Sequence, residues 1–135
     1  MKIGFALAAL AFGAVTALSS SVVADEKLES KMGVKATLDA AKKSASIVAK
    51  GIDDKTYVNT EYPIKCSVTI ASGGKLEKAE LTKADAVFEA SGKEGKAKSA
   101  TFKVGADKAI EGKCKLVACT DSACSSPFEV TFKSQ

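Results

Sequence analysis

Short stretches of alternating apolar and polar residues recur along this chain, separated by residues typical of turns. The clearest stretch spans residues 62–70, where Ile64, Cys66, Val68 and Ile70 alternate with polar side chains. Successive side chains of a β-strand point to opposite faces, so this alternation predicts a half-buried strand. Further strands are predicted at residues 76–81, 84–88, 100–104, 113–119 and 128–133. Three segments are predicted to connect them: residues 72–74 as a turn, 91–98 as an exposed loop and 105–112 as a further connection.

Residues 25–50 carry two conflicting patterns. Ala, Lys and Leu favour helices, and several apolar residues fall close to helical spacing: Leu28, Met32, Leu38, Ala41, Ala45 and Val48. In the same stretch, residues 34–40 and 45–49 alternate between apolar and polar and include β-branched side chains, which indicates strands. We favour two strands over one helix here.

Short strands at fairly even spacing predict an all-β fold, an immunoglobulin-like antiparallel β-sandwich. The chain has no internal repeat and no domain linker, so residues 25–135 are predicted to form a single domain. This domain has few large side chains and no Trp, which limits its core, and disulfides would help to stabilise it.

The first 24 residues have the pattern of a cleaved signal peptide. Lys2 precedes an apolar run at residues 3–18, and the small residues Val22 and Ala24 predict cleavage after Ala24. The run is short for a membrane-spanning helix and acidic residues follow it directly, so an uncleaved anchor fits less well. We therefore expect a bacterial periplasmic or secreted protein with no membrane span after cleavage.

The charged residues and the absence of histidine argue against several classes of function. Every basic residue is Lys, and the lysines are interspersed with Asp and Glu, so we expect a solvated surface and no nucleic-acid partner. Without His there is no Ser-His-Asp or Cys-His pair, and no motif typical of a hydrolase or transferase is present. The Cys-x4-Cys spacing is not usual for zinc, and no glycine motif would hold a phosphate. We expect neither a metal nor a cofactor.

Four cysteines allow three pairings, and strand parity distinguishes among them. Cys66 and Cys114 both fall on apolar strand faces, so we expect them to meet in the core across the two sheets. Cys119 has the opposite parity to Cys114 and would point away from the core. An extended strand would also place these two residues about 16 Å apart, too far for a bond. The predicted disulfides are therefore Cys66–Cys114 and Cys119–Cys124.

The two predicted disulfides differ in kind. Cys66–Cys114 would close a loop of nearly fifty residues inside the core, as a structural disulfide does. Cys119–Cys124 would close a loop of only a few residues and is expected to be exposed at the end of a hairpin. Short, accessible disulfides tend to be the reducible ones. Lys113 or Lys115 would lower the pKa of a nearby thiol of this pair and so favour the reactive thiolate, whereas Asp121 would raise that pKa.

The last 80 residues or so resemble a known family. The segment Tyr57-Val-Asn-Thr-Glu-Tyr-Pro63, the strand Ala100-Thr-Phe-Lys-Val104 and the loop Cys119-Thr-Asp-Ser-Ala-Cys124 followed by Pro127 carry the resemblance. They are similar to small exported bacterial proteins related to the N-terminal domain of the thiol–disulfide interchange protein DsbD. The resemblance implies an immunoglobulin-like sandwich whose two cysteines, flanking one hairpin loop, exchange electrons with exported protein partners.

By this resemblance Cys119 and Cys124 are the exchanging, catalytic pair, and Asp121 corresponds to an acidic residue of the family loop. The chain also departs from the family pattern. The cysteine spacing is one residue shorter, a pair of prolines is reduced to Pro127, and Cys66 and Cys114 are additional. The membrane and thioredoxin-like modules of the full transporter are not part of this sequence.

Two functions remain open at this point. The first is a redox module in which Cys119 and Cys124 exchange electrons with an exported protein. The second is a non-enzymatic binding or structural module in which both disulfides only stabilise the fold. A homodimer formed through an exposed edge strand is a weaker third hypothesis, and we expect a monomer rather than a dimer.

Overall fold

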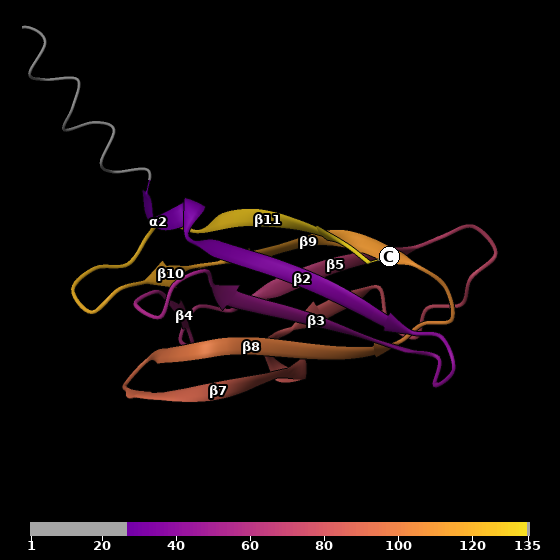
Figure 1. The fold of residues 1–135 in the computed structure, drawn as a ribbon, viewed down its shortest axis with the longest axis horizontal. Coiled ribbons are helices and arrows are strands. Elements are labelled where there is room, and N and C mark those ends of the chain that lie inside the picture. Colours follow the sequence, from indigo (N-terminus) through magenta and orange to yellow (C-terminus); the bar gives the residue numbers. More distant parts are fainter. Residues whose placement is uncertain (1–26, 135) are drawn as a thin grey trace, which may run out of the picture.

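Two antiparallel β-sheets pack face to face in the computed structural model, which describes residues 27–134 (Figure 1). The signal peptide predicted for residues 1–24, with its cleavage site, lies outside the described residues. The elements follow the order α2 (Lys27–Ser30), β2 (Met32–Asp39), β3 (Ser44–Gly51), β4 (Tyr57–Asn59), β5 (Lys65–Ile70), β6 (Glu80–Thr82), η1 (Lys83–Asp85), β7 (Ala86–Lys93), β8 (Lys96–Gly105), β9 (Ile110–Leu116), β10 (Ala118–Cys119) and β11 (Phe128–Lys133).

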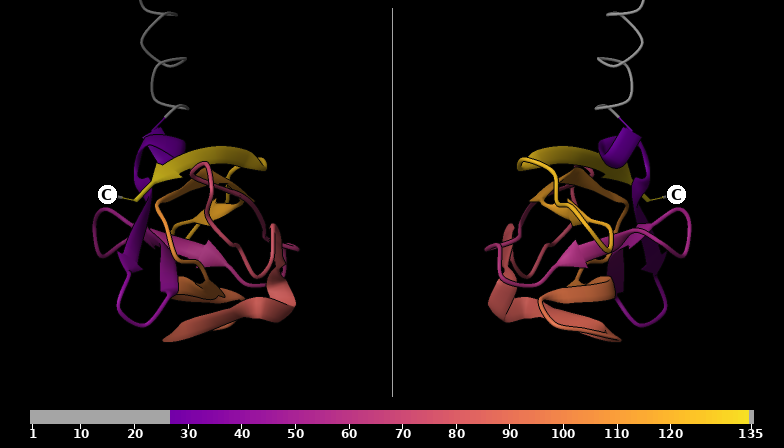
Figure 2. Two further views of the ribbon diagram at one scale, coloured as in Figure 1. Left: turned by 90° about the vertical axis from the view of Figure 1, so that its right-hand side faces the viewer. Right: turned by 90° about the vertical axis from the view of Figure 1, so that its left-hand side faces the viewer.

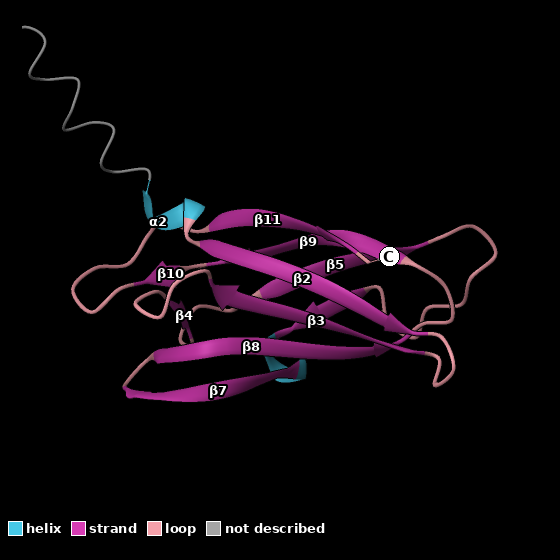
Figure 3. Ribbon diagram, in the orientation of Figure 1, coloured by secondary structure: helices cyan, strands magenta, loops and turns pink. Residues whose placement is uncertain are grey.

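Each sheet combines strands that are consecutive in the sequence, such as β2 and β3, with strands that are far apart in it. One sheet has the order β10-β4-β8-β3-β2, with β7 also paired to β8, and the other has the order β11-β9-β5-β6. Figure 2 views the molecule from both ends and shows the two layers, and Figure 3 shows that strands make up nearly all of its regular structure. The predicted all-β, immunoglobulin-like antiparallel sandwich is confirmed. No helix within residues 27–134 is long and apolar enough to cross a membrane.

The core lies between the sheets and follows the predicted alternation. Ile64, Cys66 and Val68 are buried around and along β5, and Phe102 and Val104 are buried on β8. The polar residues between them are exposed or partly exposed. Each sheet therefore contributes one apolar face to a shared core, as the strand period requires.

Residues 32–51 form two strands rather than a helix, as favoured from the sequence. β2 pairs with β3 along eight residues, and β3 pairs on its other side with β8. This central position buries Ala45, Ile47 and Ala49 against the core. Pairing on both sides of β3 outweighs the helical propensity of its Ala and Lys residues, and within residues 27–51 only Lys27–Ser30 is helical.

Two predicted connections are instead partly strand. Residues 91–98 were expected to form an exposed loop, but β7 and β8 run through them as a hairpin whose turn lies at Glu94 and Gly95. Gly95 has a φ of 74°, a conformation that suits glycine, and Ala97 is buried. Similarly, β9 begins at Ile110, inside the predicted connection 105–112. Lys98 and Glu111 lie on exposed faces of strands, whereas Glu94, Asp107 and Lys108 lie in turns or bends.

The strand predicted at residues 113–119 is broken at Val117. β9 ends at Leu116 in one sheet, and Ala118–Cys119 pair with β4 in the other sheet. The Val117 carbonyl accepts a hydrogen bond from the Asn59 backbone N–H at 2.9 Å, where the chain changes sheets. Leu116 and Ala118 on either side of this change belong to the core, whereas Val117 and Cys119 are buried without belonging to it. Cys119 pairs with Tyr57 and lies on the opposite side of the sheet from the core residue Ala118, as its parity predicted, but it has no exposed surface, which the sequence did not predict.

Replacing Gly112 with alanine is expected to destabilise the protein by about 1–3 kcal/mol, the usual cost of overfilling a packed core. A Cβ at this position would overlap the Ser67 carbonyl oxygen of β5 and lie 2.9 Å from Phe132 Cζ of β11. Gly33→Ala on β2 is the matched control, because its Cβ would meet nothing closer than 3.9 Å. Urea unfolding compares the two variants, and equal stabilities would contradict the prediction.

Candidate functional site

The disulfide Cys66–Cys114 links two neighbouring strands of one sheet. Cys66 on β5 and Cys114 on β9 stand directly opposite each other, with their Cα atoms 4.0 Å apart, the close type of antiparallel pair. Both residues point into the core as predicted, but the bond does not cross between the sheets as we expected. The reason is that β5 and β9 are adjacent strands. Neither cysteine has any exposed surface, so a partner thiol does not reach this bond.

The disulfide Cys119–Cys124 closes a tight loop at the end of β10. The two cysteines face each other as an antiparallel bridge, with Cα atoms 4.0 Å apart. Inside the loop, the Thr120 N–H donates to the Ala123 carbonyl at 2.7 Å. Beyond it, the Ser125 N–H donates to the Ala118 carbonyl at 2.8 Å. These hydrogen bonds hold the return segment against β10 and keep both cysteines together.

The two ends of this bond differ in their exposure to solvent. Cys119 on β10 is 0% exposed, with Asn59 of the neighbouring strand against its sulfur, whereas Cys124 is exposed on the loop. The sequence prediction of an exposed disulfide therefore holds for one residue of the pair. A molecule approaching from solvent reaches Cys124 and not Cys119.

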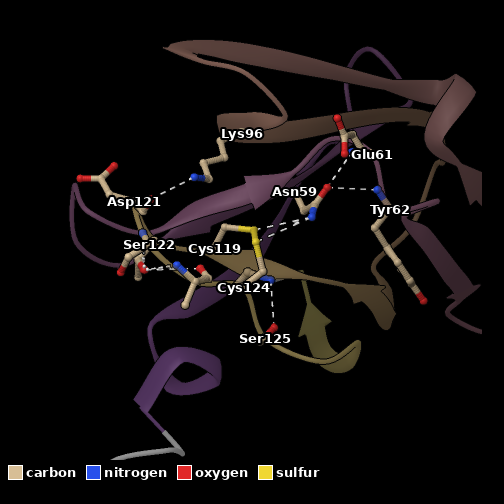
Figure 4. Close-up of a disulfide and its surroundings, with 12 residues drawn as sticks. Asn59, Glu61, Tyr62, Lys96, Cys119, Asp121, Ser122, Cys124 and Ser125 are labelled. Carbon is tan, nitrogen blue, oxygen red and sulfur yellow. Dashed lines mark hydrogen bonds between the residues drawn. A yellow bond between two sulfur atoms is a disulfide. The ribbon is translucent and has the colours of Figure 1, made fainter.

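A side chain that the sequence analysis did not assign to the site lies against both sulfurs. Asn59 ends β4, which pairs with β10, and its Nδ2 is 3.6 Å from Cys119 Sγ and 3.9 Å from Cys124 Sγ (Figure 4). Asn59 is the only asparagine in the chain, but it lies 60 residues before Cys119. Only the pairing of β4 with β10 shows that it belongs to the site.

Charged residues from the β7–β8 hairpin contact the cysteine loop. Lys93 Nζ lies 3.0 Å from Asp121 Oδ1, and Lys96 Nζ donates to the Asp121 carbonyl at 3.4 Å. The hydrogen bond and charge of Asp121, with a smaller effect of Tyr57, hold the pKa of Lys93 above its usual range. Lys93 therefore stays protonated at neutral pH and neutralises the acidic side chain of the loop.

The lysines near the loop are not those suggested by the sequence. Lys113 pairs with Glu129 on β11 at 3.5 Å, and Lys115 is exposed on β9 opposite the same glutamate. Lys93 and Lys96 take their place because the hairpin brings residues some 25 positions away against Asp121. Within residues 27–134, no three His, Cys, Asp or Glu side chains are grouped to hold a metal ion.

Fold and site together define the chain as a β-sandwich with two disulfides, a type of bond typical of oxidising, extracytoplasmic compartments. The sequence matches no protein-family model and no curated protein. Among solved structures, the periplasmic chaperone SfaE is similar, with a TM-score of 0.34 and 12% sequence identity. The match covers 77% of this chain and 56% of the chaperone chain, so it spans only about half of that protein.

Proposed function

We propose that this protein is an exported thiol–disulfide exchange domain, similar to the N-terminal domain of DsbD, that accepts electrons from exported dithiol proteins through Cys119–Cys124. The observation that supports this most is the asymmetry of the bond. One cysteine is exposed to a partner, while the other is buried beside an amide donor. A disulfide that only stabilises the fold does not require this arrangement.

The exchange begins at the exposed sulfur. A partner thiolate attacks Cys124 Sγ, the Cys119–Cys124 bond breaks, and the electron pair of that bond leaves on Cys119 Sγ as a thiolate. A mixed disulfide then joins the partner to Cys124. The partner's second thiolate then attacks the partner's first sulfur in this mixed disulfide, and Cys124 is released. The partner is thereby oxidised to a disulfide. One of its two thiol protons ends on Cys124 and the other is released to solvent, which leaves Cys119 as a thiolate.

The proposal includes the location of the protein. Residues 1–24 act as a signal peptide cleaved after Ala24, and the mature domain works as a monomer in the bacterial periplasm or outside the cell. Two disulfides support such a location, because the cytoplasm keeps most thiols reduced.

One observation favours the second function, a non-enzymatic binding or structural module. The Lys93–Asp121 ion pair and the Lys96 hydrogen bond attach the cysteine loop to the β7–β8 hairpin. In that case the disulfide would hold the loop in a shape that a protein partner recognises, and its reduction potential would have no function.

Equilibration of the purified protein in glutathione redox buffers separates the two functions. Free thiols are trapped and located by peptide mass. We expect Cys119–Cys124 to open between about −120 and −270 mV, the range of exchange proteins, while Cys66–Cys114 stays closed in the same molecules as an internal control. If both bonds stay closed to potentials below about −300 mV, as structural disulfides do, the exchange function is rejected.

A further inference from the structure

Asn59 is held in one orientation beside the exchanging sulfurs. Its backbone N–H donates to the Val117 carbonyl at 2.9 Å. Its side-chain oxygen accepts hydrogen bonds from the Glu61 N–H at 2.7 Å and the Tyr62 N–H at 3.1 Å. A flipped amide would place its NH2 group against these two donors, so the carboxamide has a single satisfactory orientation. The remaining group, Nδ2, points at the disulfide (Figure 4).

We infer that Asn59 is the residue that sets the redox equilibrium of this pair, by donating a hydrogen bond to the thiolate that Cys119 becomes on reduction. This inference rests on the proposed function and adds to it the group that stabilises the leaving sulfur. The substrate class stays that of the proposed function, an exported dithiol protein.

The physical reason lies in what each form of the sulfur accepts. A disulfide sulfur is a weak hydrogen-bond acceptor, whereas a thiolate carries a full charge and accepts a charge-assisted bond. Cys119 has no exposed surface, so water does not solvate that charge and the fixed Asn59 donor takes its place. The donor therefore stabilises the reduced form more than the oxidised form. A stabilised reduced form makes the disulfide a stronger oxidant.

Asn59→Asp tests the inference, because aspartate keeps the oxygen that accepts from Glu61 and Tyr62 but removes the donor to the sulfurs. We expect the equilibrium with a glutathione or dithiothreitol redox buffer to shift about tenfold toward the disulfide, a potential about 30 mV lower. The melting temperature of the oxidised protein should stay close to that of the wild type. Thr60→Asp is the matched control, since it adds the same charge one residue further on and leaves Asn59 in place.

Two results overturn the inference. The first is an Asn59→Asp equilibrium equal to that of the wild type. The second is an equal shift in Thr60→Asp, which would mean that negative charge near the loop acts without the donor. The rate of exchange with an exported dithiol protein is measured separately. If Asn59→Asp shifts the equilibrium but the wild type exchanges with no such protein, the proposed function fails while the role of Asn59 stands.

Discussion

Replacing Cys66 and Cys114 together with alanine is expected to lower the free energy of unfolding by about 4 kcal/mol. The bond joins residues 48 positions apart, and its main effect is to restrict the unfolded chain. A loss of this size is a large part of the 5–15 kcal/mol that holds typical domains folded. Because β5 and β9 are also paired along their length, we expect the variant to keep its sheets but to unfold at much lower urea concentration.

The matched control is the double variant Cys119→Ala, Cys124→Ala. Its loop spans a sequence separation of only 5, and the same chain-entropy argument gives a loss of about 2 kcal/mol. Equilibrium urea unfolding of both variants and the wild type measures the difference. An equal or greater loss for the 119–124 variant would show that loop length does not determine the stabilisation.

A second large effect is expected on thiol reactivity when only one cysteine of the Cys119–Cys124 pair is kept and the other is replaced. Cys119→Ser leaves a thiol on exposed Cys124, whereas Cys124→Ser leaves a thiol on fully buried Cys119. We expect the Cys124 thiol to react with a small aromatic disulfide on the order of 100-fold faster than the Cys119 thiol. Cys119 has to be exposed by local opening first, and an opening free energy of about 2.8 kcal/mol produces this factor. The release of the aromatic thiol, followed by absorbance, gives both rates.

Denatured samples of the two variants provide the control, since both thiols are then equally accessible and should react at similar rates. Similar rates in the folded proteins would contradict the assignment of Cys124 as the attacked sulfur. Faster reaction at Cys119 would reverse the order of the exchange steps and make Cys124 the leaving group.

The local pattern of side chains was sufficient for most strands and for much of the core. Ile64, Cys66 and Val68 are buried as their alternation predicts, because a strand turns every second side chain to the same face whatever its neighbours are. The same parity argument placed Cys66 and Cys114 in the core. It also holds at Cys119, which lies on the opposite side of the sheet from the core residue Ala118, but it did not predict that Cys119 is fully buried there, where Asn59 and Cys124 contact its sulfur.

The sequence by itself thus determined the sandwich class, the inward face of each regular strand and the small set of cysteine pairings that those faces allow. Only the tertiary structure decided which strands are neighbours, since backbone pairing is the same for every residue type and carries little sequence signal. That choice places β5 beside β9, making Cys66–Cys114 a bond within one sheet, and β4 beside β10, bringing Asn59 to the sulfurs. It also brings Lys93 to Asp121. The candidate site is therefore a product of strand order, which depends on how the whole chain packs.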